Sequence, residues 1–421
     1  MRHHSHTPHT AEVVIAGAGF GASCVALRLL QLNITPRILV FDRPDVGGIE
    51  ILPAHVHPLL DILELGPVFA TLKPTLATGL AQTWGRSAAV FRQGHALHID
   101  RIGLRSAMRV EATKRGAVFE RVSRLPSIGR VASARVRVGA RSFLAAIDAT
   151  GRRAAWSRPI VRYGRSVADL FAHRETAVRP IGEVVQLPSG WAYRTRHDGM
   201  ATIGVVRPPG TRPHTLPPDV SRAFDGLESA SVSYLGRRPA FAQAATSPVH
   251  GRRIAIGDAA FAHDPIGGRG LAFALGSAFA AAATVKSWWE HPAERRVATH
   301  YYRDYVDAER KHHLAFLTDF YGEPREVSPA AVPSMLKWRG RVTRAALNTD
   351  SGIAVGPAVR LPTGGHVRWL GRFDLLTLQE ICSRPRSSSA ILARLVRSGL
   401  GVEEAKMVMT WAFQKQLITQ S

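Results

Sequence analysis

The start of the chain restricts its fold more than any other part, because an apolar run leads there into a glycine-rich turn. Val13 to Ala16 is short, apolar and β-branched, GAGFGAS follows it, and Cys24 to Leu32 then shows helical periodicity. A second apolar run, Ile38 to Phe41, ends at Asp42. Strand, glycine turn, helix and strand in this order predict an α/β fold with a doubly wound sheet of the Rossmann type.

The turn predicts a dinucleotide site. Gly17, Gly19 and Ala22 fill the three small positions of G-x-G-x-x-A, which serve a tight turn, the approach of a pyrophosphate and close packing of the helix on its strand. Asp42 follows Gly17 by about 25 residues, where a carboxylate accepts hydrogen bonds from an adenosine ribose. The motif does not distinguish FAD from NAD.

A second glycine-rich stretch, IGDAAFAHDPIGGRGLAFALG, begins at residue 256. Glycine costs stability where nothing uses its freedom, and a helix that follows glycines offers free N–H groups to an anionic or electron-rich ligand. An ordinary tight turn is the alternative. The helix that follows contains the most apolar run of the chain, Leu271 to Val285, which is too short for a membrane span and predicts a buried helix.

The length, cysteine content and charge of the chain bear on its number of domains, its compartment and its partners. A chain of 421 residues predicts two or three domains, and two cysteines indicate a reducing cytoplasm. The first ten residues, MRHHSHTPHT, lack the apolar run of a signal peptide, and residues 1–11 are predicted to be a disordered tail. The formal net charge of +23 favours an acidic partner, but a GC-rich genome is the alternative, because arginine far outnumbers lysine.

Later segments differ in character. Val184 to Val206 predicts two strands around a polar hairpin, RTRHDG, within a substrate-side β-sheet at about 155–250. Residues 271–320 are predicted to be helical, with a break near His291-Pro292, and 323–372 to be a less regular connecting segment. Helical stretches near 375–383, 388–398 and 402–415 predict a small helical or winged-helix module at 373–421.

Over about residues 12–322 the chain resembles the superfamily of FAD-dependent aromatic hydroxylases and flavin-dependent halogenases. Three separated blocks and Arg101, in IDRIGLRSAM, carry the resemblance. The blocks are the glycine motif with Asp42-Arg43, IDATGRR at 147–153, and Gly257-Asp258 followed by Pro265-x-x-Gly268-x-Gly270. The resemblance implies that Asp258 hydrogen-bonds the ribityl chain of FAD and that the third block lies along the isoalloxazine. The residues that it assigns to FAD are Gly17, Gly19, Ala22, Asp42, Arg43, Arg101, Asp148, Gly257, Asp258, Pro265, Gly267, Gly268 and Gly270.

Hydroxylation is favoured over halogenation. Flavin-dependent halogenases use an active-site lysine upstream of a Gly-Glu segment, whereas DVGGIEILPAHVHPLL carries Glu50 and the first lysine of the chain is Lys73. The double-tryptophan motif of tryptophan halogenases is replaced by SGWAYRT around Trp191. In the hydroxylases a reduced flavin activates oxygen beside an electron-rich ring, and NADH or NADPH serves as a transient reductant without a second nucleotide-binding domain.

Candidates for acid–base work are His263, Asp264 and Glu50, since the first two precede the flavin-facing proline and Glu50 is expected to border the same cavity. The alternatives are a capping or ion-pair role for Asp264 and a structural role for His263. No spacing of histidines typical of a metal site is found.

With its C-terminal extension the chain resembles the flavoprotein monooxygenases that mature quinohemoprotein amine dehydrogenase. This implies dihydroxylation of a tryptophan residue in a small polypeptide subunit during tryptophylquinone biogenesis, and the basic charge suits an acidic subunit. Two other classes stay open: an FAD-dependent hydroxylase or reductase of a free aromatic or isoprenoid molecule, and a flavin-binding regulator that uses the tail on DNA. The tail also suits dimerisation or simple packing.

Overall fold

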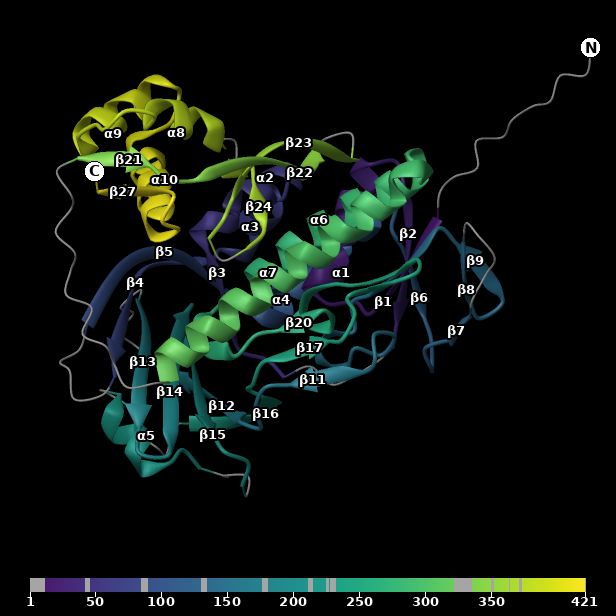
Figure 1. The fold of residues 1–421 in the computed structure, drawn as a ribbon. Helices are drawn as coiled ribbons and strands as arrows, with labels where there is room; N and C mark the ends of the chain where they lie inside the picture. The colour runs from purple at the N-terminus through teal and green to yellow at the C-terminus, as the bar shows by residue number, and fades with distance from the viewer. Residues whose placement is uncertain are drawn as a thin grey trace, which may run out of the picture. The chain divides into compact units, whose positions relative to one another are not determined.

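The structure is a computed structural model, in which the described residues are 12–41, 46–84, 90–129, 135–175, 181–210, 215–224, 227, 232–321, 335–349, 352–362, 364–370 and 373–420. Asp42 and Arg43 lie outside them. The chain divides into two compact units, Met1–Trp289 and Glu290–Ser421 (Figure 1).

The first unit begins with a six-stranded sheet in the order β18-β19-β10-β1-β2-β6. All of its neighbouring strands are parallel except β18, which is antiparallel to β19. The strands are β1 (Glu12–Ala16), β2 (Thr35–Val40), β6 (Val118–Arg121), β10 (Ala145–Asp148), β18 (Val249–His250) and β19 (Arg253–Ala255). The predicted Rossmann-type sheet is therefore confirmed.

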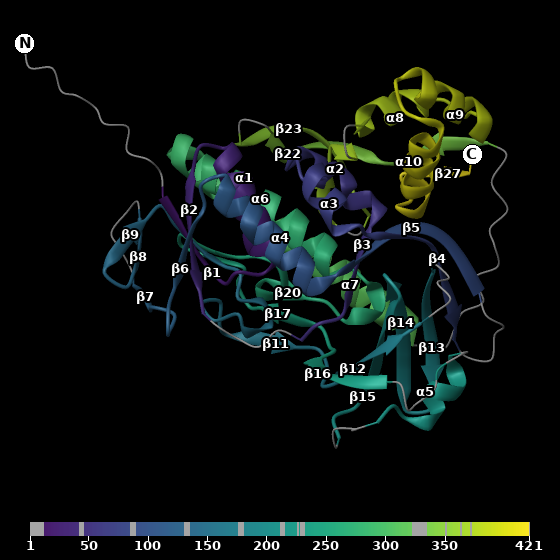
Figure 2. The same cartoon turned by 180° about the vertical axis from the view of Figure 1, so that it is seen from behind.

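The continuous apolar run of β1 explains why this sheet is covered on both faces. Val14 and Ala16 of β1 pack with Phe143 and Trp156 against the small sheet of β7 (Ile128–Gly129), β8 (Val136–Val138) and β9 (Arg141–Phe143). Val13 and Ile15 point to the opposite face because successive side chains of a strand alternate. The helices of this unit include α1 (Phe20–Gln31) and α4 (Arg101–Lys114), which pack side by side (Figure 2).

A larger, eight-stranded sheet has the order β16-β12-β15-β14-β13-β4-β5-β3. Its strands are β3 (Ile49–Pro53), β4 (Thr75–Thr83), β5 (Val90–Asp100), β12 (Val167–Arg174), β13 (Ile181–Leu187), β14 (Gly190–His197), β15 (Met200–Arg207) and β16 (Val232–Pro239). This is the second sheet, which the sequence predicted at about 155–250, but it is not confined to those residues. Residues 49–100 supply three of its strands, because β4 pairs in parallel with β13.

The predicted hairpin RTRHDG is wrong in extent. Arg194 to His197 belong to β14 and are buried, and only Asp198 and Gly199 form the turn, both at positive φ. Three strands, β13 to β15, therefore occupy the segment for which two were predicted.

Other elements of this unit lie between or beside the strands of the two sheets. They are η1 (Ala54–Val56), α2 (His57–Ile62), α3 (Gly66–Leu72), α5 (Pro218–Ala223), and a three-stranded sheet of β11 (Ile160–Arg162), β17 (Gln243–Ala245) and β20 (Phe261–Ala262). Helix α6 (Gly270–Glu290) is long and apolar enough, by length and composition alone, to cross a membrane, yet 72% of its most apolar window is buried inside the protein. This agrees with the predicted buried helix.

The second unit starts with α7 (Arg295–Tyr321), after a break that includes η6 (Pro292–Glu294), as predicted. The segment predicted to be irregular instead holds a long antiparallel hairpin of β22 (Arg341–Thr349) and β23 (Gly352–Arg360), extended by β24 (His366–Val367). Pro357 favoured the prediction of an irregular segment because proline cannot donate a backbone hydrogen bond. It is tolerated in β23 because β24 pairs only with Val359 and Arg360.

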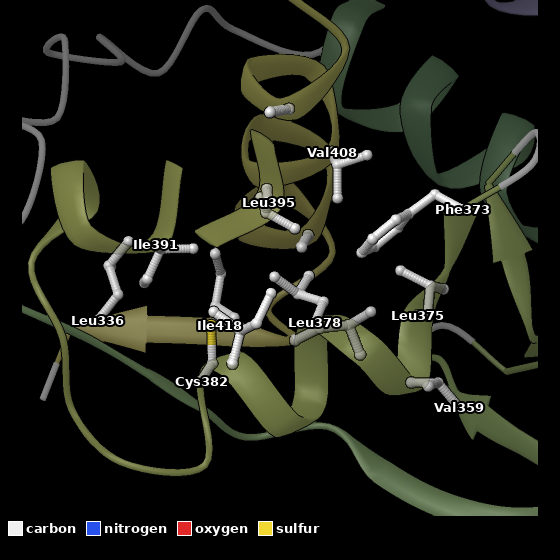
Figure 3. Close-up of a cluster of buried hydrophobic side chains, with 14 residues drawn as sticks. Leu336, Val359, Phe373, Leu375, Leu378, Cys382, Ile391, Leu395, Val408 and Ile418 are labelled. Carbon is white, nitrogen blue, oxygen red and sulfur yellow. The ribbon is translucent and has the colours of Figure 1, made fainter. Parts of the chain in front are cut away.

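The C-terminal module has a hydrophobic core of its own (Figure 3). Helices α8 (Leu375–Ile381), α9 (Ser388–Arg397) and α10 (Val402–Gln414) match the three predicted helices, and β27 (Ile418–Gln420) pairs with β21 (Leu336–Trp338). Leu336 and Val359 belong to the same core, so the predicted boundary at 373 cuts through it. The predicted helical or winged-helix-like module is confirmed with this earlier strand added.

Candidate functional site

In the first glycine turn, Gly17 is crowded by neighbouring backbone and Gly19 is not. Gly17 has φ +101°, and a Cβ there would lie 2.4 Å from the backbone oxygen of Ala149. Gly19 caps α1 with its backbone, without a side-chain cap, and a Cβ there would meet nothing within 4 Å. The start of α1 thus has no side-chain cap and has open space beside Gly19, as a helix N-terminus that binds a phosphate requires. Ala22 is buried, as close packing of the helix requires.

Asp148 holds the loop that follows β10. It is fully buried, its Oδ1 accepts hydrogen bonds from the N–H and hydroxyl of Thr150, and its Oδ2 accepts one from the N–H of Trp156 at 2.7 Å. Both oxygens of Asp148 hold this loop, and its assignment to FAD stays a prediction.

The second glycine stretch bends sharply before α6. Gly257 has φ +52° and donates its N–H to the hydroxyl of Ser277, while a Cβ there would press at 3.3 Å on Ala274 of α6. Gly268 also has positive φ, +58°, and open space beside it. Positive φ favours glycine at these two positions, which accounts for part of the glycine content of this segment.

A cavity of about 550 Å³ lies within the first unit. Its lining comes from the residues before and at the start of α6 and from the eight-stranded sheet. Predicted site residues in its lining are Glu50, Asp258, His263, Asp264, Pro265, Gly267, Gly268 and Gly270. The structure therefore brings the three acid–base candidates together with much of the third block, although Glu50 is far from that block in the sequence.

Arg152, which the sequence did not single out, joins the second block to the third. Its guanidinium donates to the backbone oxygens of Phe241 and His263, both at 2.6 Å, and its Nε lies 3.8 Å from the carboxylate of Asp258. It also lines the cavity. Arg152 thereby fixes where the carboxylate of Asp258 and the chain before Pro265 lie.

Glu50 and Arg101 form an ion pair, in which the Arg101 guanidinium donates to the Glu50 carboxylate. Arg101 is the first residue of α4, whose N-cap is Asp100. The carboxylate of Glu50, a predicted acid–base group, is thus engaged by Arg101, which is itself predicted to reach the cofactor.

The two other acid–base candidates show the contacts of their structural alternatives. Asp264 accepts a hydrogen bond from the N–H of Ile266 at 3.0 Å as the N-cap of a short 3₁₀ turn. The His263 ring packs edge-on against Phe261 and Phe273, with ring centroids 4.7 and 5.2 Å away.

The sheet side of the cavity carries aromatic and charged residues that sequence reasoning did not assign. Trp191 and Tyr193 of β14 stand 5.7 Å apart, and burial raises the pKa of Tyr193 to about 12. The Tyr193 ring covers Gly204, because a Cβ there would lie 2.1 Å from the ring. The alternation W-x-Y along one strand was the available signal, since both side chains then share a face.

A buried ionic cluster borders the same wall. Arg194 pairs with both oxygens of Glu183, at 2.5 and 3.0 Å, and with Glu175, and Arg196 pairs with both glutamates. Glu183 and Arg194 line the cavity. Burial by itself would raise the pKa of Glu183, but the hydrogen bonds and charges of Arg194 and Arg196 hold it below its usual value.

Within the described part of the chain, no group of three or more His, Cys, Asp or Glu residues is placed to hold a metal ion. No protein-family model matches the sequence, and no curated protein matches it.

Solved structures do match over nearly the whole chain. QhpG, described as a peptidyl tryptophan dihydroxylase essential for tryptophylquinone cofactor biogenesis, is 20% identical with a TM-score of 0.63, over 96% of this chain and 99% of its own. The flavin-dependent halogenase CmlS is 16% identical with a TM-score of 0.68, over 97% of this chain and 96% of its own. The chain has the fold of the flavin-dependent monooxygenases and halogenases. A flavoprotein/dehydrogenase from Cytophaga hutchinsonii matches 74% of this chain at 17% identity, with a TM-score of 0.57.

These matches weaken the inference from the C-terminal extension to a polypeptide substrate. Because the alignments with QhpG and with CmlS both extend over nearly all of this chain, the added module does not by itself separate a hydroxylase of polypeptides from a halogenase.

Proposed function

We propose that this chain is a single-component FAD-dependent monooxygenase, which uses NADH or NADPH and dioxygen to hydroxylate, twice, a tryptophan residue of a small acidic polypeptide during tryptophylquinone biogenesis. The observation that carries the proposal is the cavity of about 550 Å³ in which the glycine-rich start of α6 meets an aromatic wall. We place the reaction in the cytoplasm, given only two cysteines, both buried as free thiols.

The residues present fit FAD. The uncapped start of α1 at Gly19 suits the pyrophosphate, and Asp258, whose side chain is 40% exposed, is available to a ribityl hydroxyl. Gly267, Gly268 and Gly270 line the cavity where the isoalloxazine would lie. Asp42 and Arg43 are proposed for the adenosine end on the motif alone, and Arg101 for the cofactor through its position at the start of α4. When bound and reduced, FAD would supply an activated oxygen atom to the ring of the substrate.

The chain's own contribution is to hold the substrate ring and exclude water. Trp191, Tyr193 and Leu80 offer an apolar and aromatic surface, and burial moves the pKa of Tyr193 further above working pH, to about 12. No lysine occurs among the described residues of the lining, which supports hydroxylation over halogenation. The likeness to QhpG along nearly both full chains supports a polypeptide substrate.

Replacing Asp258 by alanine should weaken the binding of FAD by about 1.5–3 kcal/mol, because a charge-assisted hydrogen bond to the ribityl chain is lost. Isothermal titration of the apoprotein with FAD measures this. Asp258→Asn keeps an acceptor and should lose less, and Asp61→Ala, at an exposed helical position, should bind like the wild type. Equal affinity of Asp258→Ala and wild type would contradict the assignment.

The substrate is tested by mass spectrometry after incubation with FAD, NADH or NADPH, and oxygen. We expect a short acidic peptide with one tryptophan to gain one or two oxygen atoms, whereas free tryptophan gains none. Added salt should weaken the reaction with the acidic peptide and leave a neutral peptide unaffected, because salt screens charge attraction beyond about 8–10 Å. Oxygenation of free aromatics alone would favour the small-molecule alternative, and a chlorinated product in chloride buffer would favour a halogenase.

A further inference from the structure

We propose that His98 is a catalytic residue, a neutral imidazole whose Nε2 accepts the proton that an aromatic ring releases when it is hydroxylated in the cavity. This inference rests on the hydroxylase function proposed above. Neither the glycine motifs nor the acid–base candidates of the sequence include His98.

The position of His98 places it on a largely apolar wall of the cavity. It lies on β5 directly opposite Ile51 of β3 and Thr75 of β4, so these three side chains share one face of the sheet. The described residues of β3, β4 and β5 that line the cavity are otherwise apolar or glycine apart from Glu50: Ile49, Ile51, Pro53, Ala77, Gly79, Leu80 and Ala96. A proton acceptor on such a wall lies where an aromatic ring would pack.

A hydrogen bond fixes the tautomer of His98. Its Nδ1 lies 3.0 Å from the backbone oxygen of Arg196, and the residue is 2% exposed. A carbonyl oxygen can only accept, so Nδ1 carries the hydrogen, and the lone pair of the neutral ring is on Nε2. The ring is therefore arranged as a base toward any group that meets Nε2.

The surroundings of His98 keep it neutral. Burial lowers the pKa of His98 below its usual value of 6.5, the charges of His197 and Arg196 lower it further, and the hydrogen bond to the Arg196 backbone opposes them. The charged residue of β3, Glu50, is paired with Arg101. A base that is unprotonated above the acid range is ready to accept a proton at neutral pH.

The other candidates are less well placed for proton transfer. Glu50 is held by Arg101, Asp264 caps a turn, and His263 packs in an aromatic cluster. His98 is the one of these groups whose hydrogen bond leaves a defined acceptor atom.

The proton step balances as follows. Dioxygen and the reduced nicotinamide supply the oxygen atom and two electrons, and one oxygen leaves as water. When the other oxygen adds to a ring carbon, the C–H bond at that carbon breaks, its electron pair restores the aromatic ring, and a new N–H bond forms at Nε2 of His98. The imidazolium then returns its proton to solvent, and the net reaction consumes one proton together with the nicotinamide.

The test is His98→Asn in the FAD-loaded full chain, with a short acidic peptide containing one tryptophan as the probe. Asparagine keeps a donor near the position of Nδ1 for the Arg196 carbonyl and removes the base. We expect kcat for peptide oxygenation to fall about 100-fold or more, with KM and the rate of flavin reduction unchanged. The wild type should lose activity as the pH falls below 6.5, and this acid limb should be absent from the variant.

Two further variants complete the test. Imidazole added to His98→Gly should restore part of kcat. His197→Asn changes a neighbouring buried histidine that is bonded to Thr75 and does not line the cavity; it should keep kcat and move the acid limb to higher pH, since His197 lowers the pKa of His98. An unchanged kcat and acid limb in His98→Asn would overturn the role proposed for His98 and leave the proposed hydroxylase function standing. A wild-type enzyme that reduces its flavin but oxygenates no peptide would overturn the proposed function as well.

Discussion

Replacing Arg194 by methionine is expected to lower the free energy of unfolding by up to about 3–5 kcal/mol, because two largely buried carboxylates then share one guanidinium instead of two. Arg194 is 3% exposed and pairs with Glu183 and Glu175, which are 22% and 11% exposed. Arg196 alone would then face two carboxylates. Urea unfolding followed by circular dichroism measures the loss.

Arg141→Met is the matched control for this substitution. Arg141 also pairs with a glutamate, Glu120, at 3.2 Å, but the two side chains are 59% and 40% exposed. An exposed pair contributes about 0–1 kcal/mol, so the control should unfold nearly as the wild type does. If both variants lost the same small amount, the cluster on β14 would not be a buried network.

The same cluster predicts a dependence of stability on pH. The pKa of Glu183 is lower in the folded chain than its usual value of 4.5, so its contribution is complete above pH 4.5 and disappears as the pH falls through the lower folded value. Arg194→Met removes the strongest cause of that lowering. Wild type and variant should therefore differ less in stability at acid pH than at neutral pH.

The cofactor side of the fold could be predicted because its signals are local. The apolar run at Val13, the glycine turn and the helix that follows are contiguous, and so are the glycines before α6. Local steric needs, such as the positive φ of Gly17 and Gly257, leave a mark that does not depend on distant partners.

The sheet side of the cavity could not be predicted in this way. His98 meets the backbone of Arg196, and β4 pairs with β13, through contacts between residues about a hundred positions apart. RTRH was interpreted as a polar hairpin because charged residues are rarely buried; ion pairing with Glu175 and Glu183 satisfies the two arginines inside the sheet instead.

Asp148 shows a different limit of sequence reasoning. A carboxylate in a motif near a cofactor suggests a ligand, and in the structure this carboxylate accepts hydrogen bonds from Thr150 and Trp156. The distinction between holding a loop and holding a ligand lies in the directions of hydrogen bonds, which no spacing in the sequence records.

Gly17→Ala and Gly19→Ala should fail in different ways, although the glycines are two positions apart. At Gly17 the added Cβ meets the Ala149 oxygen at 2.4 Å on a backbone with φ +101°, so the chain itself must shift. Strain of this kind and overpacking each cost about 1–3 kcal/mol, and we expect Gly17→Ala to lose about 2–6 kcal/mol of stability even without FAD.

At Gly19 the added Cβ meets no atom of the chain, and φ is −82°, which alanine adopts freely. Alanine is a poorer N-cap than glycine, but it also restricts the unfolded chain, and the two effects nearly cancel at about 0.5–1 kcal/mol each. The apoprotein of Gly19→Ala should therefore unfold like the wild type. Its affinity for FAD should fall at least tenfold, about 1.4 kcal/mol, because the methyl group occupies the space through which a pyrophosphate approaches the start of α1. Thermal unfolding of both apoproteins, paired with FAD titration, separates the two effects. An apoprotein of Gly19→Ala that is stable and binds FAD with wild-type affinity would show that the open space at the start of α1 is not where the cofactor lies.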